Sequence, residues 1–402
     1  MEEWKEYKIS DVIDEISMGP FGSNIKVDNF IDSGVPVLNG SNLRGVKLNE
    51  NTFNYVSQEK ADSLGKANAY RGDVVITHRG TLGQIVYIPD DSKFEQYVIS
   101  QSQFRLKLKK DFIRPDFFVY FFHTHIGQHR ILMNASQVGV PALARPTSTF
   151  KEVSIPVPPM ETQNKVMDIL HSLDDKNEVN NQINDNLEQQ AQALFKSWFV
   201  DFEPFRDQPF VKSELGMIPE GWRVGTIGEL LEIKYGKDHK KLSDGEIPVY
   251  GSGGLMRKCE CALYDGESVL IPRKGTLNNV MYVNEAFWTV DTMFYSIPKI
   301  DNVVLFTYLY LRGKDLASMN SGSAVPSMTT EILNNMQIVI PTEMVIRDFN
   351  IKVTSIYSRI KCGNKESRRL ASLRDTLLPR LMSGELSVDD LKGCFSGWAT
   401  WR

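Results

Sequence analysis

The feature that most constrains this fold is a stretch of more than forty residues, 160–203, that contains neither glycine nor proline. Apolar residues recur in it at multiples of seven positions, and a polar residue interrupts the series only at Asn180. This interval places one apolar stripe along a helix that packs against a second helix. We therefore expect a long helix with a helical partner, and about 36 helical residues would measure on the order of 55 Å.

The expected partner lies in the same chain. Shifted by 183 positions, residues 344–386 repeat the series, with Gly363 in the place of Asn180. The residues expected to pair the helices are Val166, Leu173, Leu187, Leu194, Phe349, Ile356, Leu370 and Leu377. Residues 165–196 carry six acidic residues and three lysines, whereas the matched stretch carries seven basic and three acidic residues. Opposite charge favours pairing between the two helices, although both charged faces could instead simply be solvated.

The segments before the two helices also repeat. Residues 4–159 and 217–342 share short strands and turns in one order. Trp222 answers Trp4, residues 247–250 (IPVY) answer 35–38 (VPVL), and 273–277 (RKGTL) answer 78–82 (HRGTL). We expect a first recognition domain at 1–159, a central spacer helix at 160–203, a linker and second recognition domain at 204–342, a second spacer helix at 343–392 and a tail at 393–402.

The expected fold class is α+β. Two similar mixed α/β domains are separated by two long antiparallel coiled-coil helices, and the internal repeat gives the chain pseudo-twofold symmetry. Two similar frameworks whose loops differ suggest two reading heads held apart by a rigid spacer.

Composition excludes several classes of protein. With 402 residues, 42% hydrophobic and 24% charged, the chain is an ordinary globular protein. No apolar run reaches the roughly 18 to 20 residues of a membrane span, and the start has no signal-peptide character, so we expect no membrane association and a cytoplasmic location. The four cysteines lack the paired spacing of a zinc site and are interpreted as free thiols. A net charge of −4 does not exclude nucleic acid, because local patches decide binding.

At the helix ends and the central link the chain resembles the specificity subunit of type I restriction-modification enzymes. The resemblance rests on residues 195–202 (FKSWFVDF), 215–222 (LGMIPEGW) and 377–386 (LLPRLMSGEL), and the domain order extends it over essentially the whole chain. It implies two target-recognition domains that each read one half of a bipartite site in double-stranded DNA. It also implies helices that dock two modification (methyltransferase) subunits, which restriction (motor and nuclease) subunits then join.

The sequence lacks the motifs of a base methyltransferase and of a phosphate-binding loop. The only Pro-Pro pair, Pro158-Pro159, lacks the preceding Asn or Asp and the following aromatic residue with which an amino-methyltransferase grips a flipped base. Residues 216–221 lack the Lys-Ser/Thr of a phosphate-binding loop. His123, His125 and His129 are interpreted as packing or surface residues, because the second domain has no counterparts. We expect no catalytic residue, metal or cofactor.

Candidate DNA contacts lie in polar or basic loops. The turn Arg79-Gly80-Thr81 and its counterpart Lys274-Gly275-Thr276 combine a cation, a glycine and a hydroxyl, which suits phosphate contact, although each could be an ordinary hairpin turn. Asn and Arg side chains suit adenine and guanine edges. The full set of candidates is Ser23, Asn24, Lys26, Asn39, Asn42, Arg44, Arg79, Thr81, Gln137 and Arg145 in the first domain, and Lys237, Lys240, Lys241, Tyr250, Ser252, Arg257, Arg273, Lys274, Thr276, Ser321 and Ser323 in the second.

The sequence therefore predicts a noncatalytic DNA specificity subunit whose helices set the spacing between two half-sites and dock methyltransferase subunits. The alternative is a noncatalytic helical scaffold that assembles partners without reading DNA. A steep loss of duplex binding with added salt would distinguish the two, because phosphate contacts release counterions.

Overall fold

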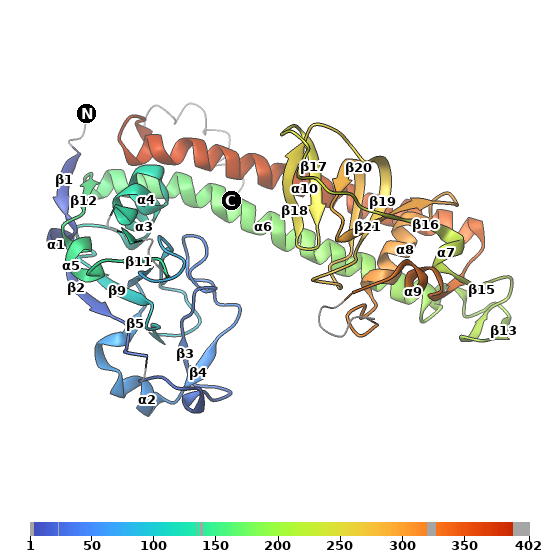
Figure 1. Ribbon diagram of the computed structural model, residues 1–402, viewed down its shortest axis with the longest axis horizontal. Helices are drawn as coiled ribbons and strands as arrows, with labels where there is room; N and C mark the ends of the chain where they lie inside the picture. Colours follow the sequence, from blue (N-terminus) through green and yellow to red (C-terminus); the bar gives the residue numbers. More distant parts are fainter. Residues whose placement is uncertain (1–3, 23, 134, 137–139, 320–326, 389–402) are drawn as a thin grey trace. The chain divides into compact units, whose positions relative to one another are not determined.

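The computed structural model describes residues 4–22, 24–133, 135–136, 140–319 and 327–388. The chain divides into two compact units, Met1–Glu178 with Arg368–Arg402, and Val179–Ser367. Each unit contains one strand-rich head and part of each of two long helices (Figure 1). Among the described residues, no helix combines the length and the apolarity needed to cross a bilayer.

The head of the first unit contains two four-stranded sheets, ordered β2-β9-β6-β7 and β4-β3-β8-β5, and the strand pairs β1–β12 and β10–β11. Both faces of strand β6 are apolar because each face is covered by a hydrophobic core. Val74 and Ile76 point into the main core with α3, whereas Val75 points into a smaller core on the other face. The strands are β1 Lys5–Lys8, β2 Ile13–Met18, β3 Val35–Val37, β4 Asn54–Val56, β5 Asn68–Tyr70, β6 Val74–Thr77, β7 Ile85–Tyr87, β8 Gln96–Val98, β9 Gln103–Leu108, β10 Ala135–Ser136, β11 Ala142–Leu143 and β12 Ser154–Val157. The helices are α1 Ile9–Val12, α2 Gln58–Ser63, α3 Pro115–His123, α4 His125–Leu132 and α5 Pro146–Lys151.

The head of the second unit is built on one six-stranded sheet, ordered β16-β21-β19-β20-β17-β18, with the separate pairs β15–β22 and β13–β14. The strands are β13 Phe210–Ser213, β14 Gly216–Pro219, β15 Arg223–Thr226, β16 Leu231–Tyr235, β17 Ile247–Gly251, β18 Gly254–Cys259, β19 Tyr264–Pro272, β20 Met281–Thr289, β21 Met293–Pro298 and β22 Gln337–Ile340. The helices are α7 Ile227–Leu230, α8 Val303–Arg312 and α9 Thr330–Asn334.

The two heads repeat one plan, which confirms the expected α+β class and internal duplication. A strand, a single helical turn and a strand open each head, as β1-α1-β2 and as β15-α7-β16. The first strand pairs antiparallel with the last one, β12 or β22. The sheet order β2-β9-β6-β7 recurs as β16-β21-β19-β20, and the parallel pair β3 and β8 recurs as β17 and β20. Strand β18 pairs antiparallel with β17 as β4 does with β3, whereas the hairpin β13–β14 has no counterpart among the described residues of the first unit.

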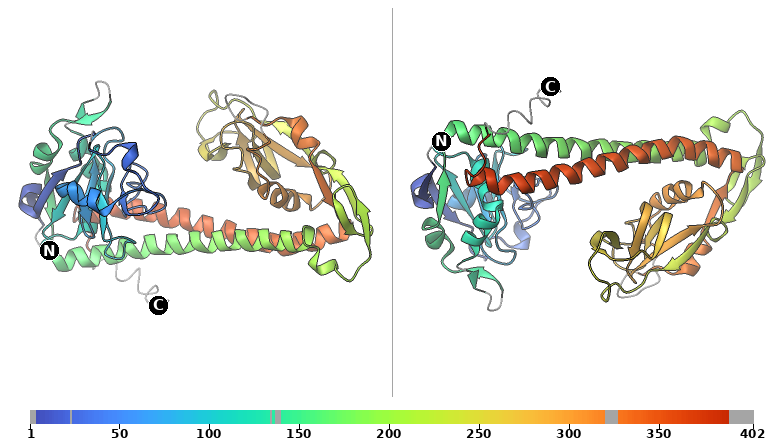
Figure 2. Two further views of the ribbon diagram at one scale, coloured as in Figure 1. Left: turned by 90° about the horizontal axis from the view of Figure 1, so that it is seen from below. Right: turned by 90° about the horizontal axis from the view of Figure 1, so that it is seen from above.

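The two long helices are α6 Met160–Phe199 and α10 Glu343–Met382, with 40 residues each. Within each unit, the parts of the two helices run antiparallel and side by side (Figures 1 and 2). In the first unit, Asp174 on α6 accepts a hydrogen bond from Arg374 on α10 at 2.8 Å. In the second unit, Asn180 donates to Glu366 at 2.9 Å. In the same unit Asn184 donates to Asn364 at 3.0 Å, so the partner number on α10 falls as the number on α6 rises, which defines antiparallel pairing.

Both long helices end earlier than the repeat alone predicts. Helix α6 ends at Phe199 instead of residue 203, because Phe202 takes a left-handed conformation with φ 53° and starts a short 3₁₀ turn. Helix α10 ends at Met382 instead of residue 392, and Gly384 follows with φ 72°, as is common after a helix C-terminus. The aromatic-rich segment 114–133 forms two helices, α3 and α4, because the Thr124 hydroxyl accepts from Gly127 N and starts α4.

Candidate functional site

In the first unit, five loops meet near one edge of the sheet β2-β9-β6-β7. Strand β2 ends beside the start of β9, with Met18 opposite Phe104, and β6 ends there as well, with Thr77 opposite Gln103. The residues that follow or precede these ends therefore lie together. Residues 140–145 join them, because Gly80 N donates to Pro141 O at 2.9 Å. We call residues 19–22, 24–26, 39–45, 78–84, 99–102 and 140–145 the first loop cluster.

The second unit builds the same cluster at the equivalent edge. Tyr235 at the end of β16 lies opposite Phe294, and Pro272 at the end of β19 lies opposite Met293. Met328 N donates to Arg273 O at 2.9 Å, which brings the loop before α9 to the turn after β19. We call residues 236–241, 252–254, 273–279, 289–292 and 327–329 the second loop cluster.

The turns nominated from the sequence occupy the same place in both clusters. Gly80 and Gly275 have φ of 87° and 85°, which glycine adopts without strain. Arg79 forms an isolated β-bridge with Ala142, and Lys274 forms one with Ser327. The sequence therefore brings a cation and a hydroxyl to the outer end of each cluster, with Arg79, Thr81, Lys274 and Thr276 all exposed.

Two further pairs of residues shape the clusters and were missed by the sequence reasoning. Gln84 donates its amide to Gly40 O at 3.2 Å, and Asn279 donates its amide to Ser252 O at 2.8 Å. Each of these side chains follows the cation of its turn by five positions and ties the turn to the loop after β3 or β17. The common offset of five positions from Arg79 and Lys274 could have identified Gln84 and Asn279 from the sequence.

Glycines begin the first loop of each cluster for a steric reason. A Cβ on Gly19 would lie 1.9 Å from Ser100 O, and one on Gly236 would lie 2.0 Å from Val290 O. Gly19 N donates to Gln103 O at 2.8 Å, and Gly236 N donates to Met293 O at 2.9 Å. Each loop therefore starts in direct contact with the backbone of the neighbouring loop of its cluster. This contact fixes the position from which the side chains that follow the glycine extend.

The structure places the other nominated residues unevenly. Exposed residues in the first cluster include Asn24, Lys26, Arg44 and Arg145; those in the second include Lys237, Lys240 and Lys241. Asn39, Tyr250, Ser252 and Arg273 are half-buried. Tyr250 donates its hydroxyl to Glu285 at 2.8 Å, and the Arg273 guanidinium carbon lies 5.4 Å from the ring centre of Tyr235. Ser23, Gln137, Ser321 and Ser323 lie outside the described residues.

Two nominated residues have an internal role instead of the expected contact with bases. Asn42 is 1% exposed, and its amide donates to Asn49 O at 2.9 Å and to Thr52 O at 3.0 Å. Arg257 donates to His239 O at 2.6 Å, to Leu242 O at 2.8 Å and to Asp244 at 2.9 Å. The hydrogen-bond donors of both side chains are used within the unit, so these side chains stabilise the neighbouring loops.

The histidine near the first turn is also structural. Burial lowers the pKa of His78, and its Nε2 lies 3.1 Å from Gln101 O, so the neutral ring donates to that carbonyl. Of the three histidines considered as ligands, His123 donates to Ile85 O at 2.9 Å, whereas His125 and His129 are exposed. Over the residues that the structure describes, no group of three or more His, Cys, Asp or Glu side chains could hold a metal ion.

The residues nominated for helix pairing lie in the cores. Val166, Leu173, Leu370 and Leu377 belong to the core of the first unit. In the second unit Phe349 is fully buried, Leu187 is 6% exposed, and the half-buried Leu194 and Ile356 pack against the core. Asn180, which interrupts the apolar series on α6, is also buried, with 5% of its surface exposed. Its counterpart Gly363 leaves room for the Asn184 side chain, because a Cβ at position 363 would lie 2.6 Å from Asn184 Oδ1.

Comparisons with known proteins agree with this arrangement of two heads and two helices. Residues 1–189 and 219–344 match the family model described as the type I restriction modification DNA specificity domain. The MjaIX specificity subunit of Methanocaldococcus jannaschii is 26% identical over 97% of this chain and 95% of that protein. The HindI specificity subunit of Haemophilus influenzae is 26% identical over 96% of this chain and all of that protein.

The fold also resembles a solved structure. The crystal structure of the type I restriction-modification S subunit from M. genitalium superposes with a TM-score of 0.56 at 18% identity, covering 94% of this chain and 96% of that one. Since the family model spans most of the sequence and both heads, the chain belongs to the family of type I restriction-modification DNA specificity subunits.

Proposed function

We propose that this chain is the noncatalytic DNA specificity subunit of a type I restriction-modification complex and that each loop cluster reads one half of a bipartite site. The observation that carries the proposal is the pair of loop clusters. Both are closed by the same bridge and the same amide tie, while the side chains that they expose differ. A shared frame with different exposed groups is what two readers of different base sequences require.

Charge supports contact with DNA phosphates. The first cluster exposes Lys26, Arg44, Arg79 and Arg145, and the second exposes Lys237, Lys240, Lys241 and Lys274. These cations are gathered at the clusters of a chain whose formal net charge is −4. Local concentration of positive charge attracts nucleic acid whatever the sign of the whole protein. The complex would act on DNA in the cytoplasm.

We further propose that α6 and α10 set the spacing between the half-sites and provide the docking surface for two methyltransferase subunits, to which restriction subunits bind. Both helices carry buried apolar residues in both units, so their register is held along their length. Matched insertions of seven residues next to Asn180 on α6 and next to Gly363 on α10 keep both apolar stripes in phase and should change the length of the spacer between the half-sites. An unchanged spacer would show that the helices do not set it.

Methylation mapping of genomic DNA from cells that carry this chain with its modification subunits tests the proposal. The expected result is a split motif, and replacement of residues 1–150 by another first head should change one half of the motif and leave the other. A helical scaffold without DNA readout predicts a motif that does not depend on either head. A continuous motif, or one that changes in both halves, would contradict the assignment of one half to each cluster.

A further inference from the structure

Phe21 is the most exposed large apolar side chain among the described residues, with 85% of its surface exposed. Of the other phenylalanines in the described part of the chain, none exceeds the 38% exposure of Phe112. A single exposed apolar side chain is common on protein surfaces, so exposure alone does not indicate a function. Phe21 differs from the usual case in its place within the first loop cluster and in the backbone that holds it there.

The backbone that leads to Phe21 is held in place. A Cβ on Gly19 would lie 1.9 Å from Ser100 O, so the chain enters the loop in direct contact with the neighbouring backbone. Pro20 is buried, and its ring fixes its own φ angle. The Phe21 carbonyl accepts a hydrogen bond from Asn24 N at 2.8 Å. The ring therefore extends into solvent from a backbone with little freedom to withdraw it.

The loop between β8 and β9 connects the segment of Phe21 to the turn of Arg79. Ser100 in this loop meets the Phe21 segment, as described above. Gln101 O in the same loop lies 3.1 Å from Nε2 of His78, the residue before Arg79. The exposed ring and the exposed cation thus stand on two segments that contact one short loop. The surface proposed to face DNA therefore combines an apolar ring with cations.

The second loop cluster has a polar residue at the position of Phe21. The glycines that begin the two loops, Gly19 and Gly236, differ by 217 positions, and the same offset relates Phe21 to Asp238. Asp238 is exposed, and its carboxylate accepts from Lys240 N at 3.1 Å. A carboxylate cannot take the place of an apolar ring among stacked bases. Any role of the ring is therefore confined to the first head.

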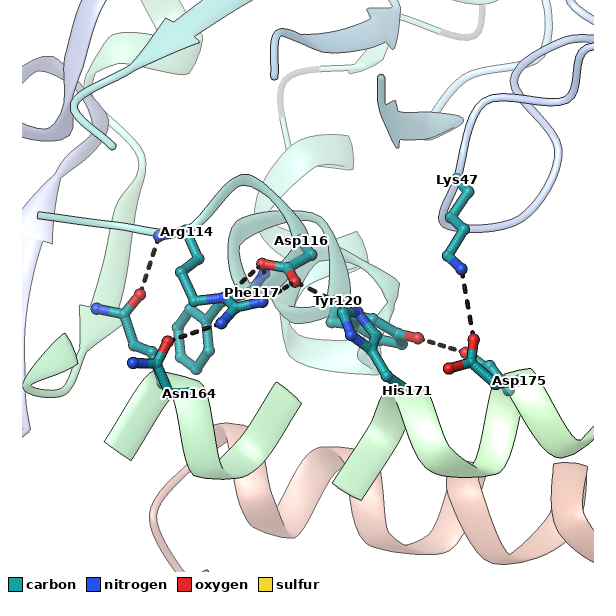
Figure 3. A network of polar contacts seen from close by, with 10 residues as sticks. Lys47, Arg114, Asp116, Phe117, Tyr120, Asn164, His171 and Asp175 are labelled. Carbon is teal, nitrogen blue, oxygen red and sulfur yellow. Dashed lines mark hydrogen bonds and ion pairs between the residues drawn. The ribbon is translucent and has the colours of Figure 1, made fainter. Parts of the chain in front are cut away.

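The head that carries Phe21 is joined to α6, as a side chain that pushes bases apart requires. Arg114 donates to Asn164 on α6 at 2.7 Å, and Lys47 lies 3.5 Å from Asp175 on α6 (Figure 3). Lys47 follows the loop 39–45 of the first cluster by two positions. The main core of this unit also contains residues of both α3 and α6. Resistance of bent DNA against the ring can therefore be borne by the long helix.

We propose that the Phe21 ring inserts between two stacked base pairs of the first half-site. Phenylalanine and other apolar side chains act as wedges at base steps in several classes of DNA-binding protein, and stacking on bases removes the ring from water. Insertion separates the two base pairs and bends the duplex at that step. This inference rests on the proposed function and assigns a residue and a mode of contact to the first loop cluster.

Duplexes that contain 2-aminopurine test the insertion, because this base fluoresces more strongly when it is unstacked. The half-site of the first head is identified by the exchange of residues 1–150 described above. The probe is then placed in turn at each position of that half-site and of its flanks. A base that the methyltransferase extrudes also becomes brighter, so the informative position is the one whose signal depends on Phe21.

The native chain is compared with Phe21→Ala, Phe21→Leu and Tyr70→Ala, each assembled with the modification subunits. Tyr70 is the matched control, because it is an aromatic residue of the same head and is 47% exposed. It pairs with Gln96, at the end of β8 that is remote from the loop between β8 and β9. Tyr70 therefore lies away from the first loop cluster.

The native chain and Tyr70→Ala should brighten the probe at one step of the first half-site in addition to the extruded base. Phe21→Ala should lose the signal at that step and keep the signal of the extruded base. Its Kd for the duplex should rise at least about tenfold, as is typical when an aromatic ring stacked on a base is removed. Phe21→Leu should retain part of both, because leucine also serves as a wedge. Without DNA, Phe21→Ala should melt with the native chain, because the side chain is exposed.

The proposal is overturned if Phe21→Ala gives the native fluorescence profile. It is also overturned if Phe21→Ala weakens binding although the native complex brightens only the extruded base, because the ring would then touch the duplex without entering it. Weaker assembly of Phe21→Ala with the modification subunits in the absence of DNA would overturn it too, since the ring would then contact protein. A native complex that binds no duplex would overturn the proposed function together with the insertion, whereas equal binding by the native chain and Phe21→Ala would overturn the insertion alone.

Discussion

Substitution of Phe349 by alanine should destabilise the second unit more than almost any other single change on the long helices. Phe349 is fully buried, and its ring centre lies 4.7 Å from that of Phe199, 5.7 Å from that of Trp198 and 6.2 Å from that of Phe195. These rings join the end of α6 to the start of α10. Truncation of a core phenylalanine to alanine costs about 3 to 5 kcal/mol, because apolar contact is lost and a cavity remains.

The loss can be measured as a shift in the thermal transition of the second unit. For a unit of 150 to 250 residues, each kcal/mol lowers the midpoint by about 2 to 4 °C, so the expected decrease is roughly 6 to 20 °C. Ile351→Ala is the matched control, because Ile351 lies two residues away on the opposite face of the same helix and is 64% exposed. Scanning calorimetry of this control should show a change in the free energy of unfolding of at most about 0.5 kcal/mol. A Phe349→Ala chain that melts with the control would refute the role given to this aromatic cluster.

Three further predictions concern DNA contact, helix pairing and pH. Lys274→Ala and Arg79→Ala should each reduce the slope of log affinity against log salt by about 0.9, measured by fluorescence anisotropy on the assembled complex, and an unchanged slope would argue against phosphate contact. Leu187→Asp places a charge at a position that is 6% exposed and should abolish helix pairing and assembly with the modification subunits in size-exclusion chromatography, so retained assembly would contradict the pairing. Burial lowers the pKa of His123, so the unfolded chain binds more protons below about pH 6.5, and stability should fall as the pH drops from there towards the lowered pKa. His123→Gln should flatten this loss in urea titrations at several pH values, and the exposed His125→Gln should not.

The long helices could be predicted from the sequence because their signal is periodic and local. The series through Val166 and Phe349 predicts two helices that pair, and the structure pairs them antiparallel. Their ends were less accurate, because termination depends on single residues such as Phe202 and Gly384 that take left-handed conformations. The heads were recognised through their repeat, although short strands such as β4 and β5, with three residues each, carry too few residues for a pattern.

The candidate site was predicted only in part, because loop polarity does not tell which side chains are already engaged. The turns around Arg79 and Lys274 were nominated correctly as equivalent positions, since both form the same bridge in their units. Asn42 and Arg257 have the same residue types as good base-reading groups, yet backbone carbonyls of their own loops occupy their donors. The amide ties of Gln84 and Asn279 join segments about 27 to 44 positions apart, and no local pattern reports such a contact.

The sequence by itself determined the duplication, the two long helices and the positions of the cations in the recurring turns. These properties follow from spacing and residue type along the chain. Only the tertiary structure decided which loops gather at one sheet edge and which polar side chains form hydrogen bonds within those loops. It also decided that the first head packs near Asp174 and Arg374, whereas the second packs against Tyr357 and Glu188. The physical reason is that a hydrogen bond or an ion pair depends on distance in space, and residues far apart in sequence come within that distance only when the sheets and helices have packed.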